Sequence, residues 1–169
     1  PEIKNYIESG WDINEDKIKV IYNPIDGNRF KHYKNENKNV TLFVGTIDYL
    51  RKETILDLIE YTKENNKELW LVGEKKDEFI NDINEDHVKY YPSTWDVEKY
   101  VKECDETASI LLGRTTIEGW LCGKPGWIYE VESSGYILSK KKHEVPQNIN
   151  TFKSENIATQ IFEEYKTII

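Results

Sequence analysis

Short apolar runs that end in glycine recur along this chain of 169 residues. Two of them are VTLFVG at residues 40–45 and ELWLVG at residues 68–73, and a third lies within residues 107–113. A short, continuous apolar run is typical of a strand that is buried on both faces of a parallel sheet. The runs therefore predict a sheet with helices packed on both of its faces.

Amphipathic segments separate these runs. Residues 54–66 place Ile55, Leu58, Ile59 and Thr62 on one helical face, and residues 95–105, 115–123 and 154–168 also read as helices. Residues 17–22, 87–92 and 125–131 read as further strands, residues 74–83 as a short helix, and the lysine run at 140–142 as a solvated loop. Strand and helix alternate with short links, so we expect an α/β fold with a Rossmann-like, doubly wound parallel sheet.

The composition limits the possible partners. The net charge is −8 with a pI near 5.0, which argues against a nucleic-acid partner but allows one small basic pocket. No run approaches the ~20 apolar residues that span a bilayer, and no signal peptide is visible. The two cysteines form no metal-binding pattern. We expect a cytoplasmic protein that holds no metal and no cofactor.

The chain has no methionine and starts within a helix-like stretch, so we interpret it as a piece of a longer protein. We expect residues 1–16 to be the end of an interdomain linker or helix. Residues 17–169 would then form one ligand-binding domain.

Ligands of such sheets bind beyond the carboxyl ends of the strands, and the turn Gly113–Glu118 lies there. Free amides at the start of the following helix, at Thr115, Thr116 and Ile117, would attract phosphate, and Arg114 adds a forked donor. The carboxylate of Glu118 can accept hydrogen bonds from two adjacent hydroxyls, such as those of a ribose. The alternative is a capping box, in which Glu118 bonds back to the first helical amide.

Two more loops follow strands. In GTIDYLRKE, residues 45–53, the adjacent cations Arg51 and Lys52 can neutralise a diphosphate, or they are ordinary solvated charges. In YPSTWD, residues 91–96, aromatic and small polar side chains suit a nucleobase, although the rings of Tyr91 and Trp95 can equally close the core.

Five segments in order resemble the C-terminal, donor-binding domain of GT-B glycosyltransferases of the family-4 type. They are KIKVIYNPIDGNRF, TLFVGTIDYLRKETILDLIEY, ELWLVGE, VKYYPSTWDVEKYVKECDETASILL and TTIEGWLCGKPGWIYEVESSG. The resemblance implies one half of a GT-B fold, with a nucleotide-sugar donor, UDP- or GDP-linked, as substrate. It also implies an acceptor bound by an N-terminal domain that this chain lacks, and any contact with the inner membrane face would be made through that domain.

The resemblance implies a role for each loop. Glu118 would hold the ribose, Arg51 or Lys52 the diphosphate, and these three would serve catalysis. The expected nucleotide-binding residues are Gly45, Thr46, Tyr91, Pro92, Ser93, Thr94, Trp95, Gly113, Arg114, Thr115, Thr116 and Glu118. We expect a hexosyltransferase that retains configuration without a metal, and an isolated chain that binds donor without transferring it.

The chain departs from the family pattern at two positions. Thr46 stands where the family has an arginine, and Ile110 stands where the family has a first glutamate that reaches the sugar. These departures leave the sugar contacts and the stereochemistry open. They also keep two alternatives open, a decayed, non-catalytic nucleotide-binding module and a sugar-nucleotide 2-epimerase of the same fold.

Overall fold

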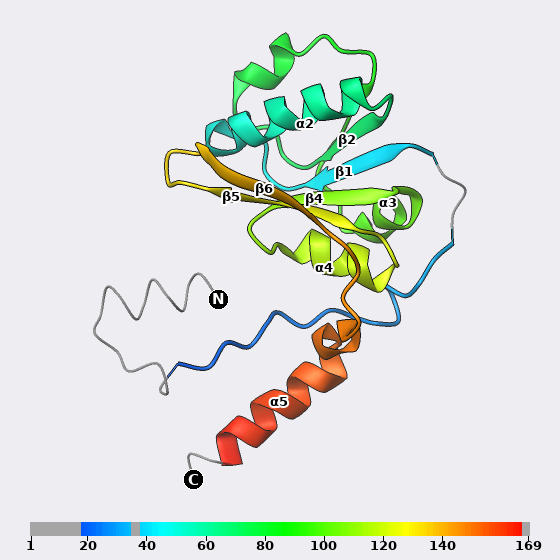
Figure 1. The fold of residues 1–169 in the computed structure, drawn as a ribbon, viewed down its shortest axis with the longest axis vertical. Coiled ribbons are helices and arrows are strands. Elements are labelled where there is room, and N and C mark those ends of the chain that lie inside the picture. The colour runs from blue at the N-terminus through cyan, green and yellow to red at the C-terminus, as the bar shows by residue number, and fades with distance from the viewer. Residues whose placement is uncertain (1–17, 35–37, 167–169) are drawn as a thin grey trace.

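The computed structural model describes residues 18–34 and 38–166, and its ribbon is shown in Figure 1. These residues form a six-stranded sheet with the order β3-β2-β1-β4-β5-β6. The strands are β1 (Val40–Val44), β2 (Glu68–Val72), β3 (Val88–Tyr91), β4 (Glu106–Ile110), β5 (Gly126–Val131) and β6 (Ile137–His143). Strands β1 to β5 are parallel and β6 is antiparallel to β5. The α/β, Rossmann-like fold predicted from the sequence is confirmed.

Helices cover both faces of the sheet (Figure 1). Helix α2 (Lys52–Glu64) packs on one face, and α3 (Val97–Glu103) and α4 (Arg114–Leu121) pack on the other. Short 3-10 turns are η2 (Tyr49–Arg51), η3 (Glu78–Asp82) and η4 (Ile149–Phe152). Helix α5 (Ser154–Lys166) extends away from the sheet. Alternation along β1 divides the core, because Leu42 joins the α3–α4 layer while Phe43 joins the α2 layer.

Two sequence predictions about the fold are wrong. Residues 18–22 form no strand, because this segment has no neighbouring strand, and only Ile25 makes an isolated bridge, to Lys153. The lysine run at 140–142 belongs to β6 rather than to a loop. Lysines are common on edge strands, where they discourage pairing with another chain, so the run has a structural use that its composition hides. The linker expected at residues 1–16 lies outside the described residues.

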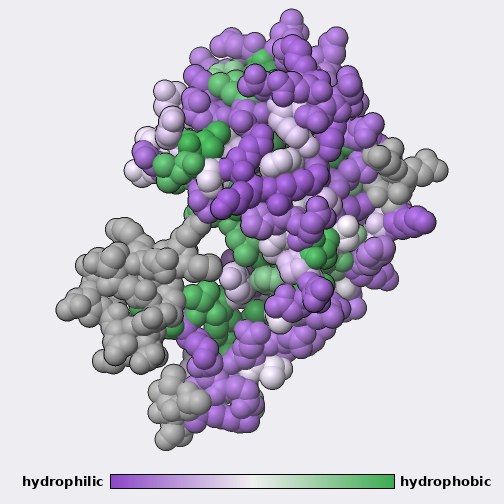
Figure 2. All heavy atoms as spheres, viewed as in Figure 1, coloured by the Kyte–Doolittle hydropathy of each residue, from purple (hydrophilic) through white to green (hydrophobic). Residues whose placement is uncertain are grey.

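The surface is mostly hydrophilic on the face shown in Figure 2, with small hydrophobic groups, one of them over the β5–β6 hairpin. Leu50 and Leu138 are among the exposed hydrophobic residues. Within the described ranges, the helices are too short or too polar to cross a membrane.

A buried carboxylate holds the centre of the sheet together. Glu106, at the start of β4, is 1% exposed. It accepts hydrogen bonds from Thr41 Oγ1 at 2.7 Å, from Lys67 Nζ at 2.6 Å and from Tyr61 Oη at 2.9 Å, and also from Lys142 Nζ. Burial opposes its ionisation, but the hydrogen bonds outweigh burial and bring the pKa of Glu106 down to about 2.

This low pKa predicts acid sensitivity. The charge of Glu106 stabilises the fold above the ordinary pKa of 4.5, and that stabilisation, on the order of 3 kcal/mol, disappears as the pH falls toward 2. Glu106→Gln should therefore lower the unfolding free energy at pH 7 by about 3 kcal/mol and flatten its dependence on pH below 4.5. Urea unfolding at several pH values measures both effects. Glu60→Gln, which changes an exposed carboxylate on α2, is the control, and equal pH profiles for all three proteins would contradict the account.

Candidate functional site

The strand order changes direction between β1 and β4, because β2 and β3 follow on one side of β1 and β5 follows on the far side of β4. In open α/β sheets, the loops at such a switch point separate and leave a crevice for ligands. A cavity of about 170 Å³ lies at this carboxyl edge. Its lining includes Gly45, Thr46, Gly73, Ser93 and Thr94, from the loops after β1, β2 and β3.

Two glycines let the loops after β1 and β2 come together. A Cβ on Gly73 would lie 1.9 Å from the carbonyl oxygen of Gly45, so no larger residue fits there without a shift of the backbone. The loops continue side by side as far as an isolated parallel bridge between Ile47 and Lys75. Where these two loops meet, the wall of the cavity is consequently backbone, which presents fixed donors and acceptors.

A larger hollow, of about 510 Å³, opens at the opposite end of the sheet, near the C-terminal end of α2. Its cations are already neutralised, since Lys63 pairs with Glu85 at 2.9 Å and Lys67 pairs with Glu106 at 2.6 Å. The parallel strands β1, β2 and β3 begin at that end, so their carboxyl ends lie at the opposite edge. We therefore take the smaller cavity at the carboxyl edge as the centre of the candidate site.

The start of α4 lies at the same edge. Gly113 is the N-cap residue, and in the described part of the chain the amides of Arg114, Thr115 and Thr116 have no hydrogen-bond acceptor. The amide of Ile117, expected to be free, donates to Gly113 O at 3.4 Å. The three remaining amides and the positive end of the helix dipole suit an anion.

The turn that leads into α4 contains a strained residue. Leu111 has φ of 55°, which is rare for a residue with a branched side chain. The Leu111 carbonyl accepts hydrogen bonds from Ser109 Oγ and from the Gly113 amide, both at 2.8 Å. Strained backbone of this kind persists where surrounding contacts fix it, and it gathers at functional sites.

Glu118 lies one turn into α4 and is buried. Its Oε1 accepts from Arg114 Nε at 2.7 Å, and its Oε2 has no partner among the residues described. Because α4 starts at Arg114, Glu118 is too far along the helix for a capping box, and that alternative is wrong. Burial raises the pKa of Glu118, and the charge of Arg114 partly offsets that rise.

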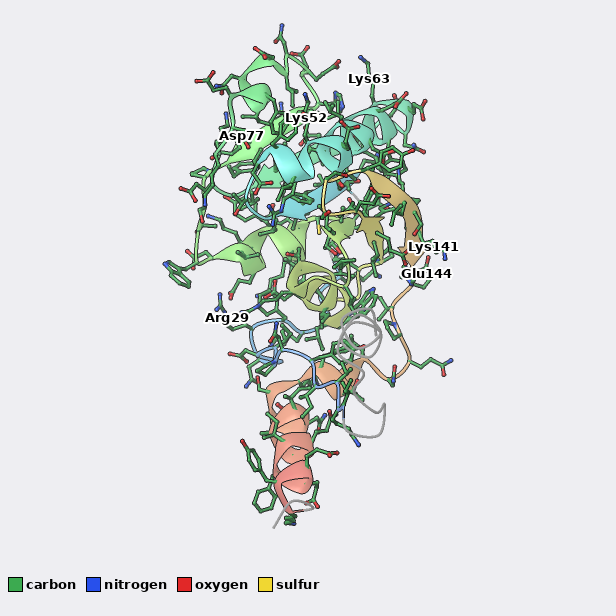
Figure 3. All side chains as sticks on the ribbon, turned by 90° about the vertical axis from the view of Figure 1, so that its left-hand side faces the viewer. Arg29, Lys52, Lys63, Asp77, Lys141 and Glu144 are labelled. Carbon is green, nitrogen blue, oxygen red and sulfur yellow. The ribbon has the colours of Figure 1, made fainter. Side chains whose placement is uncertain are left out.

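The two cations after β1 differ in their partners. Arg51 forms an ion pair with Asp48, which also caps η2. Lys52 has no carboxylate partner within the described ranges, and its Nζ lies 5.5 Å from the centre of the Tyr49 ring. Figure 3 looks onto this edge and shows Lys52 near the start of α2. Lys52 is thus the cation more available to a ligand.

The aromatic residues after β3 separate in the same way. Tyr91 packs edge-on against Trp70, with ring centres 5.6 Å apart, and its role is in the core. Trp95 does not close the core, because it is 95% exposed. Pro92 is exposed as well, and Ser93 and Thr94 line the cavity. The loop therefore contributes small polar groups to the cavity and a free indole beside it.

Sequence reasoning missed several residues of this edge. The sequence shows only that Gly73 and Leu111 lie at the ends of strands. Gly73 matters because the backbone of Gly45 comes close to it, and Leu111 because its φ is positive, and neither property can be read from residue type. Arg29 precedes β1 and reaches the loop after β3 through a hydrogen bond to Trp95 O at 3.2 Å. Only the tertiary fold brings these segments together.

The two glycines of the cavity give a matched pair of variants. Gly73→Ala should lower the unfolding free energy by more than about 2 kcal/mol, because its Cβ would strike the Gly45 carbonyl. Gly45→Ala should cost less than about 1 kcal/mol, since its Cβ would meet side chains rather than backbone, namely the Phe43 ring at 3.4 Å and Arg51 Nε at 3.8 Å. Urea unfolding measures both values. Equal costs, or a larger cost at Gly45, would contradict the backbone contact described here.

No family model and no curated protein matches this sequence. Solved structures do match the fold. Alr3699/HepE of Anabaena, in complex with UDP and glucose, superposes with a TM-score of 0.66 at 18% identity, over 96% of this chain and 60% of that one. AviGT4, a glycosyltransferase involved in avilamycin A biosynthesis, gives 0.65 at 14% identity, over 90% of this chain and 58% of that one.

WaaG, a glycosyltransferase involved in lipopolysaccharide biosynthesis, gives a TM-score of 0.52 at 17% identity, over 72% of this chain and 40% of that one. The chain thus spans about three-fifths or less of the length of these proteins. It has the Rossmann-like fold of one domain of the GT-B glycosyltransferases, as the order of its sequence motifs predicts.

Proposed function

We propose that this chain binds the nucleotide-sugar donor of a glycosyltransferase. One observation carries the proposal: a cavity, a helix N-terminus with free amides and a buried carboxylate all lie at the carboxyl edge of the same parallel sheet. The fold adds support, since structures that share it were solved in complex with UDP, with UDP and glucose, or with UDP-glucose.

In this proposal the nucleobase occupies the 170 Å³ cavity. Gly45, Gly73, Ser93 and Thr94 line that space together with Glu74, and backbone and hydroxyl groups of this kind can bond the edge of a base. The ribose then lies toward α4. The unpaired oxygen of Glu118 accepts one ribose hydroxyl, and Oε1 is shared between Arg114 and the other hydroxyl.

The diphosphate binds the first turn of α4. The amides of Arg114, Thr115 and Thr116 point to it along the helix axis, and the exposed guanidinium of Arg114 forms a second contact. Lys52, at the start of α2, adds charge. We assign this role to Lys52 rather than Arg51, because Arg51 is neutralised by Asp48.

The chemistry is departure of the nucleoside diphosphate from the sugar. Negative charge develops on the phosphate as the glycosidic bond breaks, and fixed amides with two cations stabilise it without reorganisation. No step in this proposal uses a metal. An acceptor would be bound by a second domain facing the same edge, so that the chain alone binds donor and transfers nothing. The donor base is uracil or guanine, and the stereochemistry follows from residues around Ile110 and from that second domain.

Calorimetric titration tests the proposal. UDP-glucose, GDP-mannose and ADP-glucose are titrated into the chain, and we expect saturable binding of UDP-glucose or GDP-mannose but not of ADP-glucose. Glu118→Gln should weaken that binding about tenfold, because an amide accepts a weaker hydrogen bond from ribose than a carboxylate does. Arg114→Gln should weaken binding of the diphosphate compound but not of the free nucleoside.

The control is Glu85→Gln, which changes a carboxylate near the opposite end of the sheet and should leave the affinity unchanged. Circular dichroism of each variant establishes that it is folded. The absence of binding to all three compounds by the folded chain, or equal affinities for the parent and Glu118→Gln, would contradict the proposal.

A further inference from the structure

Trp95 is unusual on this surface. It is 95% exposed, and the next most exposed large hydrophobic side chain among the residues described is Tyr49, at 66%. An indole left in water is costly, and tryptophan is enriched where proteins bind partners or aromatic ligands. Ser93 and Thr94, the two residues before Trp95, line the candidate cavity, and so does Val97, two residues after it. The exposed ring therefore stands in the loop that forms one wall of that cavity.

Arg29 holds this loop from a distant part of the chain. Its Nη2 donates to Trp95 O at 3.2 Å, and its Nε donates to Glu98 Oε2 at 2.5 Å. Glu98 belongs to the first turn of α3. One guanidinium thus bridges the loop backbone and the helix that follows, and both partners lie more than 60 residues away in sequence.

The backbone under Arg29 is itself fixed. Asp26 Oδ1 accepts from the amides of Asn28 and Arg29, at 2.8 and 3.3 Å. Phe30, the next residue, is 2% exposed and anchors the turn in the core. Figure 3 shows Arg29 at the same edge of the molecule, below the sheet and beside α4. Arg29 is 44% exposed and Glu98 31%, but the bridge also includes the Trp95 carbonyl and starts from a turn anchored by Phe30, so it restrains the loop.

We infer that Arg29 is a positioning residue of the nucleotide site, which holds the Trp95 loop so that the indole stacks on the nucleobase in the cavity. This inference rests on the proposed function. Base–aromatic stacking tolerates any base, so Trp95 would add affinity while the backbone of the cavity selects the base.

Two measurements test the inference. The first is the dissociation constant for the preferred nucleotide-sugar. Trp95→Ala should raise it about tenfold and Trp95→Phe less than about threefold, because a benzene ring still stacks. Arg29→Ala should raise it about fivefold, the value of one ordinary hydrogen bond. In a chain that already carries Trp95→Ala, adding Arg29→Ala should raise the dissociation constant by less than about a further twofold, because Arg29 acts through the Trp95 ring.

The second measurement is amide hydrogen exchange of residues 93–96 in the absence of ligand. Arg29→Ala should speed exchange there, and the control Lys63→Ala, which breaks an exposed ion pair with Glu85, should not. Unchanged amide exchange in Arg29→Ala would overturn the inference. It would also be overturned if Arg29→Ala and Trp95→Ala together raised the dissociation constant by the product of their separate effects.

The outcome also separates this inference from the proposed function. A parent chain that binds no nucleotide-sugar overturns both. A parent chain that binds, with Trp95→Ala binding equally well, overturns only the inference.

Discussion

The reversal of strand order between β1 and β4 is the constraint on which the rest of this structure depends. Glu106 stabilises one end of the β1–β4 pair. It lies opposite Thr41 of β1, accepts a hydrogen bond from it, and forms ion pairs with Lys67 and Lys142. The other end must stay open, since the chain leaves β1 and β4 toward opposite sides of the sheet. The stabilising contacts of Glu106 and the opening for a ligand therefore lie at opposite ends of the same pair of strands.

Each part of the candidate site lies at the open, carboxyl end of these strands. Gly73 allows two loops to share one backbone wall, the strained turn at Leu111 brings α4 close to the end of β4, and burial keeps Glu118 beside the free amides. The cations at this edge differ in how available they are to a ligand. Arg51 serves its own turn through Asp48, whereas Lys52 and the exposed Arg114 can reach a phosphate. Acidic Glu118 and basic Arg114 lie within a few residues of each other. The site can therefore accept hydrogen bonds from the hydroxyls of a ligand and attract its phosphates.

The sequence was sufficient for what depends on local pattern. Buried strands with terminal glycines and amphipathic helices predicted the α/β fold, and a glycine at a strand end predicted the turn at Gly113. It was insufficient where a partner decides the outcome. Residues 18–22 alternate like a strand but have none beside them, and the lysines of β6 read as a loop because Asp57 and Glu106 are far away in sequence. Tyr91 and Trp95 looked alike, and only packing separates the core ring from the exposed one.

The most direct test of the central claim is to titrate the ¹⁵N-labelled chain with UDP-glucose or GDP-mannose, whichever it binds in calorimetry, and to follow its amide resonances. The account predicts that the largest shifts fall on residues 45–46, 93–95 and 113–116, which come from three separate loops at one edge of the sheet. Residues 62–68, around the larger hollow at the opposite end, should not move. Shifts concentrated on residues 62–68, or none at the carboxyl edge at saturating ligand, would contradict it.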